Sequence, residues 1–182
     1  MIVKCFKLFA CILAITLLSG CTVVKTKDKE NYRFCLSACY GAEEYMPGAD
    51  VVADDDSFTY KYYVSYELFG GEGIVVTQSL TDETFEECKE EVMNSYTFLS
   101  EPVWDDYTQR YVISEVEFEL DGYSFFVIEN NSIVYDPPKL FGMIAFSEKE
   151  KKIKYFSFYC QDLDYIEDMA YFVEDEFPGW EK

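Results

Sequence analysis

The sequence contains no histidine, and this absence excludes several kinds of catalytic site. A Ser-His-Asp triad and a Cys-His pair both use an imidazole as general base, so neither can be built from this chain. No serine is followed by lysine three positions later, which also excludes the Ser-x-x-Lys arrangement. Carboxylates and thiols remain as candidate reactive groups.

Basic residues are scarce. The chain has 15 Lys and Arg against 35 Asp and Glu, which gives a net charge of −20. Nucleic-acid binding is excluded, because it depends on Lys and Arg that neutralise phosphates. An acidic surface attracts basic partners instead, so a basic protein or an envelope ligand is the kind of partner that the charge favours.

Long apolar runs are also missing, apart from one between Leu8 and Leu18. A helix needs about 20 apolar residues to cross a bilayer, so this run is too short to span one. Lys4 and Lys7 precede it and small residues follow it. This order is typical of a secretory signal peptide.

The sequence Leu18-Ser19-Gly20-Cys21 resembles the lipobox of bacterial lipoprotein precursors. In that class the cysteine thiol receives a diacylglyceryl group, the signal is cut just before it, and the new amino terminus is acylated, for instance with palmitate. The resemblance implies that residues 1–20 are a signal peptide and that Cys21 holds the protein on the extracytoplasmic face of the cell membrane. The alternative is an ordinary secretory signal with a chance cysteine.

The resemblance ends at Cys21, and the rest of the chain is not recognised as a member of a known family. Residues 21–31 are charged and without apolar periodicity, so we expect the lipidated cysteine to be followed by a flexible tether. Residues 32–182 are rich in aromatic side chains and predict a single globular domain.

Several segments carry strand and helix patterns. Residues 58–69 and 74–80 are rich in β-branched and aromatic side chains and predict two strands. Thr81 or Asp82 can cap a helix that follows. The apolar stripe of this helix consists of Phe85, Cys88, Val92, Tyr96 and Leu99.

Four further strands and a final helix are predicted beyond this. Residues 110–120 alternate apolar and acidic side chains, and Asp121-Gly122 is a tight-turn signal into the next strand. Residues 140–147 and 153–160 predict a second hairpin. Asp162 can cap a last helix, whose apolar stripe consists of Leu163, Ile166, Ala170, Val173 and Phe177.

This order, ββαββββα, predicts an α+β fold. Strands joined by short turns pair antiparallel, and the helix stripes need a sheet face to cover. We therefore expect one antiparallel sheet of about five to seven strands with two main helices packed on it. The element order is also similar to that of PsbP-like domains, which implies an α/β/α sandwich as the alternative.

The candidate site residues are few. Cys35 and Cys39 lie one helical turn apart and allow a disulfide, although buried free thiols are the other possibility. Their spacing to the remaining cysteines does not predict a metal site, and no motif predicts a cofactor. Glu115, Glu117 and Glu119 alternate along one strand and predict an exposed acidic face.

Tyr63 belongs to the densest aromatic cluster but points away from its even-numbered neighbours. With the three glutamates it is a candidate for a binding surface. The leading hypothesis is a non-enzymatic binding module for a protein, peptide or envelope ligand. A hydrolase of envelope glycans that uses paired carboxylates, and an acidic immunity or inhibitor protein, are the alternatives.

Overall fold

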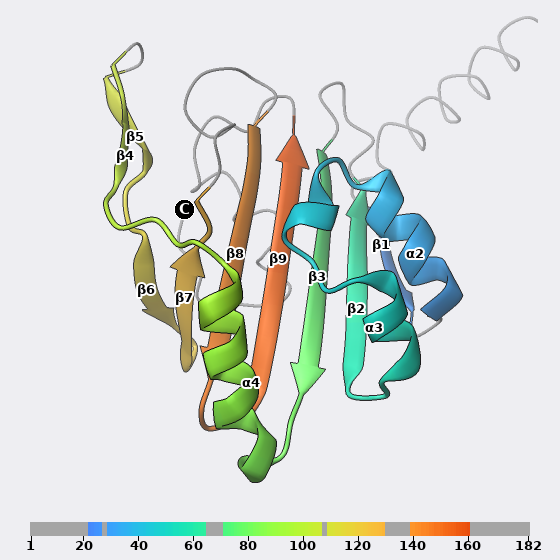
Figure 1. Cartoon of the computed structure of the whole chain (residues 1–182). Coiled ribbons are helices and arrows are strands. Elements are labelled where there is room, and N and C mark those ends of the chain that lie inside the picture. Colours follow the sequence, from blue (N-terminus) through green and yellow to red (C-terminus); the bar gives the residue numbers. More distant parts are fainter. Residues whose placement is uncertain (1–21, 27–28, 65–70, 107–108, 130–138, 161–182) are drawn as a thin grey trace, which may run out of the picture.

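The computed structural model describes residues 22–26, 29–64, 71–106, 109–129 and 139–160. They form an α+β fold with one large antiparallel sheet, helices on one of its faces and a separate two-stranded ribbon (Figure 1). The fold class and the antiparallel sheet that the sequence predicts are confirmed. The sheet has seven strands, the upper limit of the expected range.

The strand order in the main sheet is β1-β2-β3-β9-β8-β7-β6, and every neighbouring pair is antiparallel. The strands are β1 (Thr22–Thr26), β2 (Phe58–Val64), β3 (Gly71–Ser79), β6 (Glu117–Leu120), β7 (Tyr123–Val127), β8 (Lys139–Ser147) and β9 (Lys152–Cys160). The ribbon pairs β4 (Val103–Asp105) with β5 (Arg110–Ile113).

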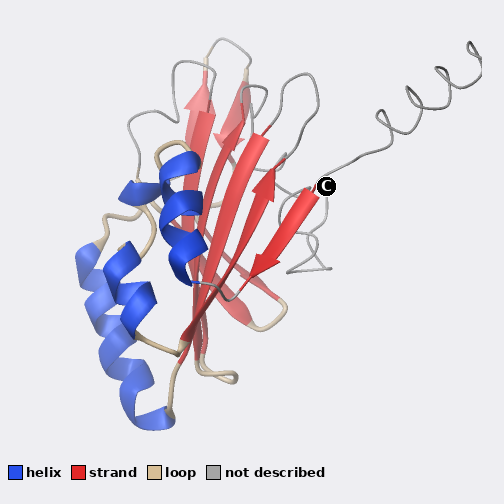
Figure 2. Ribbon diagram, turned by 90° about the vertical axis from the view of Figure 1, so that its right-hand side faces the viewer, coloured by secondary structure: helices blue, strands red, loops and turns tan. Residues whose placement is uncertain are grey.

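The described helices all lie on the same face of the sheet (Figure 2). They are α2 (Lys29–Ala38), the short 3₁₀ helix η1 (Ala42–Glu44), α3 (Ala49–Asp54) and α4 (Asp82–Ser95). None of them combines the length and the apolar character that a membrane span requires. The predicted helix and its cap at Thr81 are confirmed. However, α4 ends at Ser95, so Tyr96 and Leu99 of the predicted stripe lie beyond it, and Leu99 packs against the core on the opposite face of the sheet.

The strands bury both faces of the sheet. The face under the helices carries Phe58, Tyr60 and Tyr62 of β2, which alternate with more exposed residues as their even spacing predicts. The opposite face carries an apolar layer to which the ribbon contributes. Its buried members are Val75, Val112, Ile113, Tyr123, Phe125, Val127, Phe141, Met143, Ala145, Phe156 and Phe158.

The predicted hairpin around Asp121-Gly122 is confirmed. Both residues have positive φ angles, 50° and 80°, as a two-residue turn between twisted strands requires. The turn joins β6 to β7 in a regular register from Leu120 and Tyr123 outwards.

The tether expected over residues 21–31 is a wrong prediction. Thr22–Thr26 form the edge strand β1 against β2, and α2 already begins at Lys29. The sequence Thr-Val-Val-Lys-Thr has strong β propensity, which its charged surroundings concealed. As a result, the strand follows directly after Cys21, without a spacer.

The single strand expected over 110–120 is also corrected. The chain bends at residues 114–116, so that β5 pairs with β4 and β6 pairs with β7. The alternation continues through the bend and gives no sign that the pairing partner changes. The final helix predicted after Asp162 lies outside the described residues.

Candidate functional site

A groove of about 230 Å³ opens between α3 and α4 on the helix-covered face of the sheet. Its floor consists of Phe58 of β2, Gln78 of β3 and Tyr155 of β9. Phe58 and Tyr155 are almost fully buried, which makes the floor largely aromatic. Gln78 supplies an amide group among these rings.

The two walls of the groove come from different helices. Pro47 and Val51 stand on the α3 side, and the α4 side is lined by Cys88, Glu91, Val92 and Ser95. Val51 is 56% exposed, although it is an apolar side chain. The groove is therefore apolar at its floor and on the α3 wall, and gains its polar groups mainly from α4.

A contact between the two sides closes one end of the groove. Tyr96, which ends α4, directs its hydroxyl to the carbonyl of Tyr45, just before α3, at 3.4 Å. On the α3 side, the Tyr32 hydroxyl of α2 donates to the carbonyl of Pro47 at 2.7 Å. These bonds hold the segment from Tyr45 to Pro47 in place between α2 and α4.

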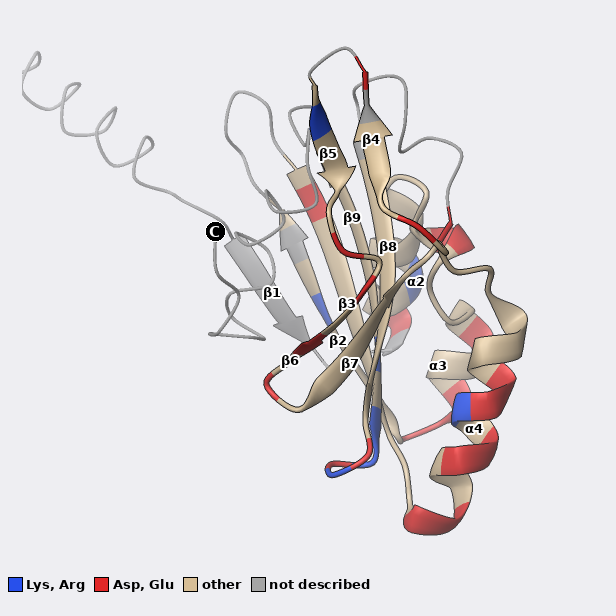
Figure 3. Cartoon of the chain, turned by 90° about the vertical axis from the view of Figure 1, so that its left-hand side faces the viewer, with Lys and Arg blue, Asp and Glu red and all other residues tan. Residues whose placement is uncertain are grey.

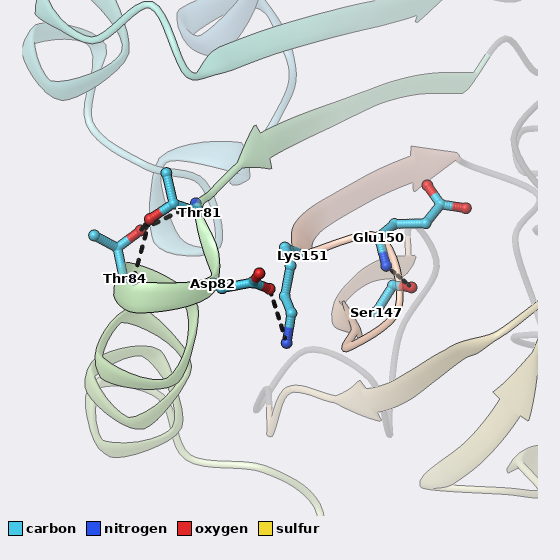
Figure 4. A network of polar contacts seen from close by, with 6 residues as sticks. All are labelled: Thr81, Asp82, Thr84, Ser147, Glu150 and Lys151. Carbon is cyan, nitrogen blue, oxygen red and sulfur yellow. Dashed lines mark hydrogen bonds and ion pairs between the residues drawn. The ribbon is translucent and has the colours of Figure 1, made fainter.

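The N-terminus of α4 is fixed to the turn between β8 and β9 (Figure 4). Thr81 and Thr84 form a reciprocal capping box, and Lys151 lies 3.7 Å from Asp82 across the gap. The backbone amide of Leu80 donates to the carbonyl of Lys151 at 2.8 Å. The position of the α4 wall is therefore set by the sheet itself.

The lysines beside α4 pack on aromatic rings as well as pairing with acids. Lys151 lies 5.0 Å from the ring centroid of Phe85, and Lys89 lies 5.9 Å from that of Phe146. Lys89 also pairs with Glu148 at 2.7 Å. These cations thus lie against the sheet side of α4, and Lys151 pairs with Asp82 in the first turn of the helix.

The groove has a negative electrostatic environment. Burial raises the pKa of the Cys88 thiol, and the charges of Glu91, Glu87 and Asp55 raise it further. Burial likewise raises the pKa of Tyr155. Because Asp55 follows α3 and the two glutamates belong to α4, the negative charges that act on this thiol come from both sides of the groove.

These acids belong to a wider acidic layer over the helices, which is visible along α4 (Figure 3). Its exposed members are Glu43, Glu44, Asp50, Asp54, Asp55, Asp56, Asp82, Glu83, Glu86, Glu87, Glu90 and Glu91. Of these, Asp50 is paired with Arg33 and Asp82 with Lys151. We call this set the acidic helical layer.

The binding surface suggested by the sequence is not brought together. Tyr63 lies in β2, whereas Glu117 and Glu119 lie in β6 at the far edge of the sheet, and Glu115 precedes that strand. The three glutamates are exposed, as expected. The side chain of Tyr63 and all of Cys21 lie outside the described residues.

Cys35 and Cys39 are free thiols, both buried against the sheet, so the disulfide that their spacing allowed is not formed. Tyr60 of β2 lies beside the Cys35 thiol and Ser157 of β9 beside the Cys39 thiol, and each lowers the thiol pKa by less than burial raises it. Burial raises the pKa of Cys39 to about 12. Both residues therefore serve as core side chains, Cys35 within α2 and Cys39 directly after it.

Sequence reasoning missed the groove, although it identified one of its walls. The apolar stripe of α4 was visible, but the stripe predicts only that the helix packs on a sheet. The neighbouring α3 wall comes from residues with no strong periodicity. Within the described ranges, no group of three or more Cys, Asp or Glu is arranged to hold a metal ion.

Comparison with known proteins identifies no relative of this chain. No family model, no curated protein and no solved structure matches it. The function must therefore be argued from the groove and its surroundings.

Proposed function

We propose that the chain is a lipid-anchored, extracytoplasmic binding protein whose groove between α3 and α4 takes up a basic, amphipathic segment of a protein or peptide. The observation that carries this proposal is an apolar groove inside the acidic helical layer. An apolar floor gives contact area for aliphatic or aromatic side chains. Acids on both rims of the groove pair with lysine or arginine residues that flank these apolar side chains in the ligand.

The charge distribution also favours fast capture of such a ligand. A surface of one sign raises the rate at which an oppositely charged partner meets it, and this effect weakens as salt increases. Lys89, the lysine of α4, is paired with Glu148 of the turn between β8 and β9. The charges of Glu87 and Glu91 from α4 and of Asp55 from the end of α3 all act on the Cys88 thiol, so the negative field extends over the groove.

The groove supports binding better than glycan hydrolysis. A glycosidase places two carboxylates about 5–10 Å apart across its cleft. Glu91 supplies the only carboxylate among the described residues that line the groove. The glutamates of β6 lie on an exposed edge strand rather than in a cavity.

The membrane location rests on the lipobox-like sequence that ends at Cys21. Two acyl chains give stable membrane anchoring, whereas one gives only marginal binding. Intact mass of the protein from its host tests this directly. We expect the wild-type protein to lack residues 1–20 and to carry the added mass of a diacylglyceryl group. A Cys21→Ala variant should show neither change. A wild-type protein that is cut without added lipid would contradict the anchor.

Titration calorimetry with a synthetic helical peptide of lysine and leucine tests the groove. We expect binding that weakens as salt is added, and no binding of the matching peptide with glutamate in place of lysine. Glu87→Gln with Glu91→Gln should weaken binding, because Glu91 lines the groove and the charge of Glu87 acts on Cys88 in the same wall. Val51→Asp should also weaken it by placing a charge on the apolar wall.

The matched control is Glu117→Gln with Glu119→Gln, which removes the same charge from the distant β6 strand. We expect this pair to leave the affinity almost unchanged. Equal weakening by both double variants would show that total charge, rather than the groove, attracts the peptide, and would refute the proposed site.

A further inference from the structure

The ribbon of β4 and β5 carries two exposed aromatic rings that face each other across its strands. Trp104 and Tyr111 are register partners, with ring centroids 4.9 Å apart in an edge-to-face arrangement. Trp104 is 44% exposed and Tyr111 is 49% exposed. The indole N–H of Trp104 donates to Asp106 at 3.1 Å, so its polar group is satisfied while the ring stays open to solvent.

These rings do not belong to either core. The ribbon buries Val112 and Ile113 in the layer behind the sheet, and Val103 packs against the same layer. Trp104 and Tyr111 are absent from both hydrophobic clusters of the described structure. Amphipathic aromatic rings that are held rigid and exposed are typical of contact surfaces.

The ribbon projects beyond one particular end of the sheet. Both of its legs leave beside the last residue of β7, because Leu99 donates to Val127 and Val127 donates to Val116, each at 2.9 Å. Val127 pairs with Met143 in the middle of β8, and β7 runs towards the end of the sheet at which β8 starts. The ribbon then extends past the strand ends (Figure 1).

The strand β1 begins at that same end. Thr22 pairs with Val64 at the end of β2, and Val64 pairs with Glu72 near the start of β3. Glu72 pairs with Tyr159, and Tyr159 pairs with Leu140 of β8. We call this the Thr22 end of the sheet. The exposed Tyr40 packs its ring on Tyr159 and therefore lies at this end too.

No tether separates Cys21 from β1, so the proposed lipidation site lies next to the Thr22 end of the sheet. Cys21 is directly bonded to Thr22, and one residue reaches at most about 3.6 Å. A lipid on Cys21 would therefore draw the Thr22 end of the sheet against the bilayer. The anchor stands at the β1 edge, while the ribbon stands at the β6–β7 side, roughly 25–30 Å away at about 4.8 Å per strand.

We propose that Trp104 and Tyr111 enter the bilayer interface and give the protein a second membrane contact, which fixes its tilt. The proposal rests on the lipidation of Cys21. Tryptophan and tyrosine favour the headgroup level, where the ring meets acyl chains and the polar group meets water. The carboxylate of Asp106, near the tip of the ribbon, repels anionic headgroups. The membrane surface that suits this contact is therefore a zwitterionic one.

Fluorescence of the lipidated mature protein in phosphatidylcholine vesicles tests this contact. The chain has two tryptophans, so Trp180→Phe leaves Trp104 as the sole emitter. Intact mass first verifies that Cys21 carries its lipid, and circular dichroism verifies the fold. We expect the Trp104 emission to shift to the blue on reconstitution and to be quenched when the vesicles contain brominated phosphatidylcholine.

The matched control places tryptophan at the opposite end of the sheet. Lys149→Trp, in a chain with Trp104→Phe and Trp180→Phe, puts the emitter in the exposed turn between β8 and β9. Its emission should be the same in brominated and ordinary vesicles. Equal quenching at both positions would show that the domain has no fixed tilt, which overturns the proposal.

The outcomes separate this proposal from the anchor on which it rests. Unquenched Trp104 emission in a protein whose mass shows lipid on Cys21 refutes the second contact and leaves the anchor intact. The exposed pair would then be available to a protein or glycan instead. A mass without lipid on Cys21 overturns both.

Discussion

Gly142 of β8 lies directly beneath the ring of Tyr45. A Cβ atom on Gly142 would come within 2.6 Å of Cδ1 and 2.7 Å of Cγ of that ring. Tyr45 is 2% exposed and belongs to the core between the helices and the sheet. Tyr45 also accepts the hydrogen bond from Tyr96 that closes one end of the groove. The contact between Tyr45 and Gly142 therefore sets the distance between that end of the groove and the sheet.

Gly142→Ala should therefore destabilise the protein by about 1–3 kcal/mol, the usual cost of forcing extra volume into a packed core. Urea denaturation measures the change. Adding Tyr45→Leu should relieve the clash, so that the double variant loses less stability than the two single losses added together. Strict additivity would show that Gly142 and Tyr45 do not constrain each other.

The hydroxyl of Tyr45 offers a separate test. It is buried and has no hydrogen-bond partner among the described residues. Tyr45→Phe removes this uncompensated polar group, so we expect unchanged or slightly increased stability in the same denaturation experiment. A clear loss of stability would mean that the hydroxyl does have a partner.

The capping box of α4 predicts a measurable stability loss in Thr81→Ala. The variant leaves the amide of Thr84 without its side-chain acceptor, at a cost of about 1 kcal/mol. For a chain of this size that corresponds to a fall in Tm of roughly 2–4 °C. Glu86→Ala on the exposed face of the same helix should stay within about 0.5 kcal/mol.

Lys154 predicts a stability change that depends on pH. The residue is 8% exposed, and burial lowers its pKa to about 8, helped by the charges of Lys61 and Lys152, while Glu150 opposes the shift. In the unfolded chain a lysine titrates near pH 10.4. Between these values the unfolded state binds more protons, so the contribution of Lys154 to folding stability improves as pH rises.

Lys154→Met should consequently increase stability at pH 7, and this advantage should shrink from pH 8 towards pH 10.4. Urea denaturation of both proteins at a series of pH values, with reductant present, measures the difference. The comparison cancels the titration of the buried tyrosines and thiols that both chains share. An advantage that does not change with pH would contradict a buried charge at position 154.

The buried thiols predict a reactivity order. Cys39 is 2% exposed with a pKa raised to about 12, and Cys35 is 5% exposed with a raised pKa. The thiolate is the reactive form, so native protein should label at Cys88, which is partly exposed, well before these two. Iodoacetamide labelling followed by peptide mass analysis gives the order. Fast labelling of Cys35 or Cys39 in folded protein would refute their burial.

Much of the fold can be predicted from local patterns. The α4 helix has its cap at Thr81 and its apolar stripe at helical spacing, and the hairpin at Asp121-Gly122 has the residues that a tight turn requires. These signals arise between neighbours in sequence. The partners of 110–113 and of Thr22–Thr26 could not be predicted in this way, because each choice depends on which distant strand offers a free edge.

The candidate site could likewise be predicted only in part from the sequence. The sequence by itself determined the acidity, the absence of histidine chemistry and the helix that forms one wall, because composition and periodicity are properties of the chain. Only the tertiary structure decided that α3 stands opposite α4 and that the ribbon projects from the end where β1 begins. Those relations are set by the packing of Tyr45 over Gly142 and by the order of strands in the sheet, which join residues far apart in sequence.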